Sequence, residues 1–256
     1  MAEIEIFKLF LLVMVRFSGL MVSAPVLGSS NVPVAAKIGL SFFGAMLITP
    51  TLPMLETGIP GEALSFAVLA IGEFIIGLLI GFVVGLVFAA VQVGGQIMDL
   101  QTGFGMMNVF NPALETQFPI FGFFLFILAV LYMLVMNLHH IMIVALAHTF
   151  EVIPIGGFMA QPALLWEVSR WGDAMFVDGL IIAAPVAAAM MLAYVTMGLI
   201  GRVIPQIQLF VVGFPITIAT GLAVTALSIS IYLHVILGGM FDRTFERVDL
   251  LIRGMG

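Results

Sequence analysis

Charged side chains are scarce in this sequence of 256 residues. Lys, Arg, Asp and Glu make up 9% of the chain and hydrophobic residues 62%, whereas an average soluble domain carries about 25% charged residues. So few charges could not cover the surface of a water-soluble monomer, and no stretch has the composition of a soluble domain. The long apolar runs predict an all-α integral membrane protein that forms a single membrane domain.

Other absences exclude several kinds of chemistry. Cysteine is missing, so the chain has neither disulfides nor thiol chemistry. Eight Lys and Arg face 14 Asp and Glu without forming a basic cluster, which makes nucleic acid an unsuitable partner. The sequence contains no nucleophile elbow, GxGxxG or phosphate-binding loop. It therefore predicts neither an enzyme nor a cofactor or metal site, and any transport must draw its energy from elsewhere.

Six apolar segments are long enough for about 20 residues of membrane-spanning helix. Their expected ranges are 6–27, 35–55, 62–98, 120–150, 174–203 and 209–238. The third and fourth exceed a ~30 Å hydrocarbon core at 1.5 Å per residue, so they tilt, break or extend beyond the lipid. Pro185 and Pro215 predict kinks in the last two segments. We therefore expect about six long helices in kinked hairpins.

The longest polar interruption covers residues 99–119 and reads DLQTGFGMMNVFNPALETQFP. Non-helical backbone at membrane depth is tolerated where it is buried in protein or lines an aqueous cavity. An ordinary surface loop would seldom expose so many large apolar side chains. These side chains are Phe104, Met106, Met107, Phe110 and Phe118, and Pro112 lies among them. Their chemistry suits a constriction inside a protein pore.

Small residues form a stripe in the third segment. Gly77, Gly81 and Gly85 recur at intervals of four residues, and Ala89 extends the row. Such a stripe lets two helix backbones approach closely in lipid. It predicts tight packing against a neighbour that belongs either to this chain or to another subunit.

Polar residues within the apolar segments are the remaining candidates. Glu73 and Asp178 are intramembrane acids, but each lies near the expected start of its segment, which favours an interfacial position. A polar hairpin tip, carrying Arg202, Pro205 and Gln206, separates the last two segments. This tip is either a simple interfacial turn or a docking point for other polypeptides.

The charged stretch that ends the chain gives the clearest sign of orientation. Arg243, Arg247 and Arg253 follow the last apolar segment. An excess of Lys and Arg marks the cytoplasmic side of a membrane protein. We therefore expect residues 241–256 to form a cytoplasmic tail. Earlier in the chain, residues 161–173 are expected to form a polar connector between the fourth and fifth segments.

Three stretches of motif, together with Pro25-Val26-Leu27-Gly28 near the start, span nearly the whole chain in one order. They run Gly103-Phe104-Gly105 to Asn111-Pro112 and Pro119; then His139-His140 with Ile153-Pro154-Ile155-Gly156; then Ala184-Pro185, Gly198-Leu199-Ile200-Gly201-Arg202-Val203-Ile204-Pro205-Gln206 and Gly213-Phe214-Pro215. In this pattern the chain resembles the FliR family of flagellar type III secretion export-gate proteins and their virulence-system relatives. The Arg-x-x-Pro-Gln stretch with its downstream Gly-Phe-Pro is the most specific piece.

The resemblance implies a place in an assembly. One copy of the chain would join FliP-like and FliQ-like subunits in a helical cone around an export channel, in the bacterial inner membrane at the flagellar basal body. Residues 1–160 would correspond to the FliP-like part and 174–240 to a FliQ-like hairpin. The loop at 103–119, here named the plug segment, would close the channel. FlhB-like and FlhA-like export components and unfolded export substrates would be the other partners.

Alternatives to a flagellar gate subunit come from three classes. The equivalent subunit of a virulence secretion system shares the motifs. A small-solute secondary transporter would suit broken helices and intramembrane charges, although the six segments lack a convincing inverted repeat. An intramembrane enzyme is disfavoured because no catalytic pairing is present.

Overall fold

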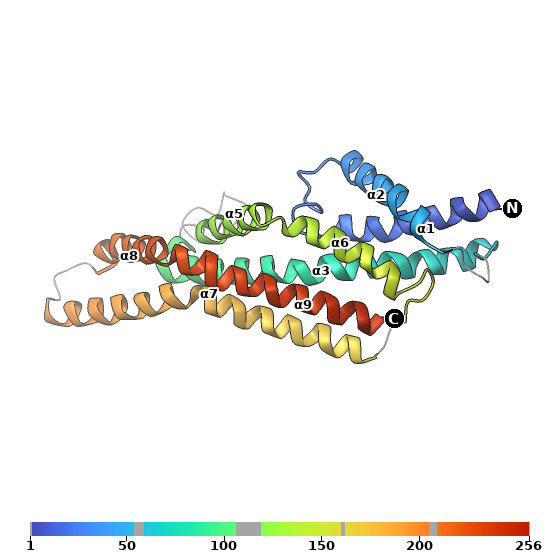
Figure 1. Cartoon of the computed structure of the whole chain (residues 1–256). Coiled ribbons are helices and arrows are strands. Elements are labelled where there is room, and N and C mark those ends of the chain that lie inside the picture. Colours follow the sequence, from blue (N-terminus) through green and yellow to red (C-terminus); the bar gives the residue numbers. More distant parts are fainter. Residues whose placement is uncertain (1, 54–58, 106–118, 160–161, 205–208, 256) are drawn as a thin grey trace. The chain divides into compact units, whose positions relative to one another are not determined.

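A computed structural model describes residues 2–53, 59–105, 119–159, 162–204 and 209–255 (Figure 1). Within those ranges the chain is helical and contains no strand. Five helices are long and apolar enough to cross a membrane, and a bent helix pair brings the number to six if it counts as one span. The prediction of an all-α integral membrane protein is confirmed.

The helices of the described ranges follow one another along the chain. They are α1 (Ala2–Ser23), α2 (Val34–Ile48), the 3₁₀ turn η1 (Thr49–Thr51), α3 (Ala63–Thr102), α5 (Ile120–Val135), α6 (Leu138–Val152), α7 (Pro162–Val203), α8 (Leu209–Ile231), the π-helical segment η2 (Tyr232–Leu237) and α9 (Gly238–Met255). The longest two, α3 and α7, have 40 and 42 residues. No proline lies in α3, and α7 continues as a helix through Pro185.

The expected fourth segment is two helices rather than one. α5 and α6 meet at an angle of 65°. Asn137 lies at the bend with φ +55°, a left-handed conformation that Asn adopts more readily than most residues because its short side chain can bond locally. Of the three outcomes expected for the over-long segment at 120–150, the structure therefore shows the break, and the two helices together still qualify as one broken span.

Two stretches expected outside the helices are helical. Most of the connector predicted at 161–173 forms the first turns of α7, and the predicted tail at 241–256 forms most of α9. Along α9, Phe241, Val248 and Leu251 are buried, whereas Asp249 and Arg253 form an exposed ion pair of 2.8 Å. Apolar residues at helical spacing give α9 one buried face, and Asp249 and Arg253 lie exposed outside it.

The chain divides into two compact units, each with its own core. The first unit comprises residues 1–86, 133–171 and 242–256. In this unit α1 packs against α2. Its core includes Leu12, Leu20, Ile80 and Leu146, all fully buried.

The second unit comprises residues 87–132 and 172–241. It holds the C-terminal part of α3, most of α5 and α7, all of α8 and η2. Aromatic rings organise its core: Phe88 lies edge-on to Phe126 and to Phe241, and Tyr132 stacks on Phe241. This unit contains the residues that flank segment 106–118.

Candidate functional site

α3 ends at Thr102, directly before the plug segment. The helix therefore extends four residues into the polar interruption predicted at 99–119. Residues 99–102 belong to the last turn of α3, and Gly103 follows with φ +94°. Glycine is favoured directly after a helix because it adopts a left-handed conformation without a Cβ penalty. A Cβ on Gly103 would also lie 2.9 Å from Cε1 of Phe214. Both the backbone angle and the available space therefore require glycine here.

Side chains from two other helices bind the last carbonyl groups of α3. The final carbonyls of a helix have no partner within the helix. The Tyr194 hydroxyl of α7 donates a hydrogen bond to the carbonyl of Gln101. The Thr217 hydroxyl of α8 donates one to the carbonyl of Thr102 at 2.9 Å. The C-terminus of α3 is therefore fixed to both α7 and α8.

A single carboxylate fixes the start of α5 on the other side of segment 106–118. The Oδ1 and Oδ2 atoms of Asp99 accept hydrogen bonds from the backbone nitrogens of Phe121 and Gly122, at 3.0 and 3.2 Å. Asp99 is only 4% exposed. A carboxylate at a helix N-terminus satisfies otherwise unpaired N–H groups and interacts favourably with the helix dipole. Asp99 is thus a structural anchor, whereas the sequence placed it in the break.

An aromatic contact joins the two flanks directly. The rings of Phe104 and Phe121 lie 5.7 Å apart in an edge-to-face arrangement, a favourable geometry for aromatic pairs. Phe104 is the predicted plug residue that falls within the described ranges, and it is half-buried in the second unit. Met106, Met107, Phe110, Pro112 and Phe118 lie outside the described residues.

Two of the three stripe glycines contact α1 of the same chain. A Cβ on Gly77 would overlap the carbonyl oxygen of Arg16, and one on Gly81 would lie 3.0 Å from the backbone carbonyl carbon of Ser23. A Cβ on Gly85, in contrast, would meet nothing within 4 Å. The neighbour at the first two positions is therefore this chain itself.

The predicted hairpin tip is described only in part. Arg202 lies in the last turn of α7 with its side chain exposed. Pro205 and Gln206 lie outside the described residues.

Sequence reasoning missed a buried charge network in the first unit. Arg16 and Glu73 are both fully buried and form an ion pair of 2.6 Å. Arg16 also donates to the Thr149 hydroxyl at 2.9 Å and to the carbonyl of Ile153 at 3.2 Å. The second Glu73 oxygen accepts the backbone N–H of Gly156 at 2.9 Å.

This network corrects the interfacial interpretation of Glu73. Its carboxylate is paired in the interior because Arg16, 57 residues earlier, lies opposite it. Asp178 was expected near a helix end, but it is buried and lies well inside α7, because that helix begins twelve residues before the predicted segment. The only sign of this pair in the sequence is that Arg16 and Glu73, of opposite charge, lie in two different apolar segments.

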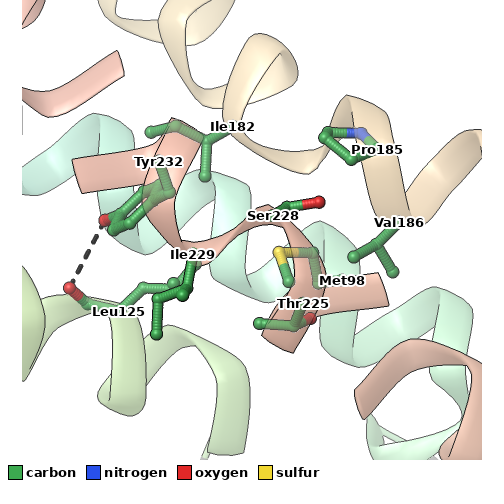
Figure 2. Close-up of a pocket in the computed structure, with 9 residues that line it drawn as sticks. All are labelled: Met98, Leu125, Ile182, Pro185, Val186, Thr225, Ser228, Ile229 and Tyr232. Atoms are coloured by element: carbon green, nitrogen blue, oxygen red, sulfur yellow. Dashed lines mark hydrogen bonds between the residues drawn. The ribbon is translucent and has the colours of Figure 1, made fainter. Parts of the chain in front are cut away.

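The pocket shown in Figure 2 is too small for a substrate. Its lining comes from five elements of the second unit: α3 (Met98), α5 (Leu125), α7 (Pro185), α8 (Thr225) and η2 (Tyr232). The pocket volume of about 20 Å³ admits roughly one water molecule. Its side chains are apolar apart from three hydroxyl groups, and among the described residues no three His, Asp or Glu converge to hold a metal.

Comparison with known proteins relates the whole chain to one family. Residues 7–242 match the family described as bacterial export proteins, family 1. The chain is 31% identical over 259 residues to the flagellar biosynthetic protein FliR of Bacillus subtilis (strain 168), covering 99% of this chain and 98% of the relative. It is also 31% identical over 213 residues to FliR of Escherichia coli (strain K12), covering 83% and 81% of the two chains.

These matches extend through both units, including α3, α5 and the residues that flank segment 106–118. The range that matches the family contains the motifs around Gly103 and between Arg202 and Pro215. The chain therefore belongs to family 1 of the bacterial export proteins, the FliR family.

Proposed function

We propose that this chain is a non-enzymatic pore subunit of the flagellar type III protein export apparatus and that its plug segment closes the export channel. Its family and the names of its relatives support a membrane component of flagellar export. The observation that carries the plug assignment is the double anchorage: α7 and α8 hold one flank and Asp99 holds the other. A closing segment needs fixed ends if its apolar side chains are to return to one position.

The chemistry of segment 106–118 suits a seal. Met106 and Met107 carry flexible, apolar thioethers, which fill irregular gaps around other side chains. Phe110 and Phe118 add large apolar surfaces. Such a seal needs no catalytic group, and opening it would depend on energy supplied by other components of the apparatus.

The proposal includes partners and an orientation. FliP-like and FliQ-like subunits would surround the chain in one complex. Residues 1–160 would correspond in fold to a FliP-like subunit and residues 174–240 to a FliQ-like hairpin. FlhB-like and FlhA-like components would contact the assembly, which would lie in the bacterial inner membrane at the flagellar basal body. The basic C-terminal residues support a cytoplasmic C-terminus by the positive-inside rule.

Thiol cross-linking tests the channel assignment, because the chain has no cysteine of its own. Met106→Cys and Phe110→Cys should each cross-link to an export substrate that is stalled in the apparatus. Leu227→Cys, on an 83% exposed position of α8, is the matched control and should not. Failure of both plug-segment variants in an intact complex would refute the assignment.

Deletion of residues 105–110 tests the seal separately. Assembly should persist because Asp99, Thr102 and Thr217 are unchanged, while the membrane should become leaky to ions. Conductance across membranes that contain the whole complex measures this effect. A deletion complex with wild-type conductance would refute a closing role.

A further inference from the structure

Two glutamines lie on one face of α3 without a partner in the described part of the chain. Gln92 and Gln96 are four residues apart, which places them on the same helix face, and both side chains are exposed. The span that carries them, Ala63–Thr102, contains mostly apolar residues. A carboxamide has two donor hydrogens and an acceptor oxygen, so exposing two of them to lipid tails is unfavourable.

A valley lies beside these glutamines where α3 meets α5. A Cβ on Gly95 would lie 2.6 Å from the backbone nitrogen of Gly122, so the two helix backbones are in contact there. The pocket beside this contact has a volume of about 280 Å³. It is lined by Gln92, Gln96, Pro119, Gly122, Phe123 and Phe126. Its walls are therefore aromatic on the α5 side and carboxamide on the α3 side.

We infer that this valley receives a transmembrane helix from another subunit of the export apparatus, one that presents a hydrogen-bonding side chain to Gln92 and Gln96. The inference rests on the proposed function, since it needs a membrane-embedded partner. Lipid tails offer no hydrogen bonds, whereas Ser, Thr, Asn or Gln on a neighbouring helix would satisfy the carboxamides. Ala89, half-exposed one turn earlier on the same face, leaves room for a close backbone approach.

A second copy of this chain fits the valley less well. Two copies related by a two-fold axis would bring the same surface patch together, so valley would face valley. Their carboxamides could pair with one another, but no side chains of either copy would fill the hollow between α3 and α5. An aqueous conduit also fits poorly because Phe123 is 47% exposed along the same wall. A single apolar helix with one polar residue matches both sides of the valley.

Site-specific photo-cross-linking in the assembled complex tests the inference. A benzophenone amino acid at Gln96 should give an adduct with an integral membrane subunit of the same apparatus, identified by mass spectrometry. The matched control carries the probe at Leu192, which is 72% exposed on α7, and should not give that adduct. An adduct with a stalled export substrate, an adduct between two copies of this chain, or no adduct at Gln96 would each overturn the inference.

Paired substitutions measure the contribution of the carboxamides. Gln92→Met with Gln96→Met keeps the side-chain length and removes the hydrogen-bonding groups. We expect about a five- to tenfold loss of the cross-linked subunit on purification in detergent, from two interhelical hydrogen bonds. Gln92→Asn with Gln96→Asn should restore part of the loss, and Leu192→Met should cause none. Unchanged retention in the paired Met variant would contradict the inference.

The outcomes separate this inference from the function on which it rests. If the wild-type chain purifies with no export subunit at all, both fail. If the complex purifies normally while the Gln96 probe and the paired Met variant behave like their controls, only the valley assignment fails.

Discussion

The first unit buries a charged network, whereas the flanks of segment 106–118 in the second unit are held largely by neutral hydrogen bonds. Arg16 and Glu73 pair with each other inside the first unit, and both make further hydrogen bonds: Arg16 to Thr149 and Ile153, and Glu73 to the backbone nitrogen of Gly156. Tyr194 and Thr217 instead bind backbone carbonyls at a helix end. Removing one partner of the Arg16–Glu73 pair leaves the other charge buried and unpaired. Breaking the Tyr194 or Thr217 hydrogen bond leaves no charge unpaired.

This difference fits the role that we propose for the plug segment. A helix that should not move gains from a contact that is very costly to break, and Arg16 fixes α1 against α3 and the end of α6 in this way. A segment that opens and recloses needs ends held firmly enough to return, without a charge that would be left unpaired on opening. Asp99 is the charged exception, and it binds only backbone groups of α5.

The strongest test removes one partner of the charge network. Glu73→Ala should lower the free energy of unfolding by about 3–5 kcal/mol, because it leaves Arg16 buried without a counter-charge. Denaturant titration of the purified chain in mixed micelles measures this loss. Glu151→Ala breaks an exposed pair with His148 and should cost about 0–1 kcal/mol.

A double variant distinguishes charge from packing at the same site. Arg16→Met with Glu73→Leu removes both charges and should recover most of the stability lost in Glu73→Ala, since apolar replacements of a buried pair are often neutral. If the double variant is as unstable as the single one, the shape of the network rather than its charge stabilises the first unit.

Substitutions in the glycine stripe should change the free energy of unfolding by less, and Gly85 provides a control within the same stripe. Gly77→Ala places a methyl group against the α1 backbone and should cost about 1–3 kcal/mol through overpacking. Gly85→Ala enters open space and should be neutral or stabilising by about 0.5–1 kcal/mol, because alanine favours helix over glycine. Equal melting temperatures for the two variants would show that α1 and α3 do not approach at Gly77.

Asp99 tests the anchorage in the second unit. Asp99→Ala removes both backbone hydrogen bonds at the start of α5 and should cost about 0.5–2 kcal/mol, as for other helix caps. Unlike Glu73→Ala, it should also raise ion conductance in the assembled complex, because one flank of the plug segment loses its fixed position. Normal conductance together with reduced stability would make Asp99 a purely structural residue.

The sequence predicted the helical membrane class and most helix ranges, because long apolar runs are sufficient to identify spans. It did not predict the bend at Asn137, since hydropathy carries no information about a left-handed φ angle. Nor could it place Asp99 opposite the start of α5, or Glu73 opposite Arg16. Those contacts depend on which helices become neighbours, and that arrangement is encoded by packing across the whole chain.

The smallest expected effect tests whether a neutral hydrogen bond is enough to hold the plug segment. Thr217→Val keeps the shape of the side chain and removes the bond to the carbonyl of Thr102, at a cost of about 0.5–1.5 kcal/mol. Thr225→Val is the matched control, because its hydroxyl binds the Gly221 carbonyl of its own helix. Both variants should lose similar stability, but only Thr217→Val should increase conductance. Equal conductance in the two would mean that α8 stabilises the end of α3 without controlling the seal.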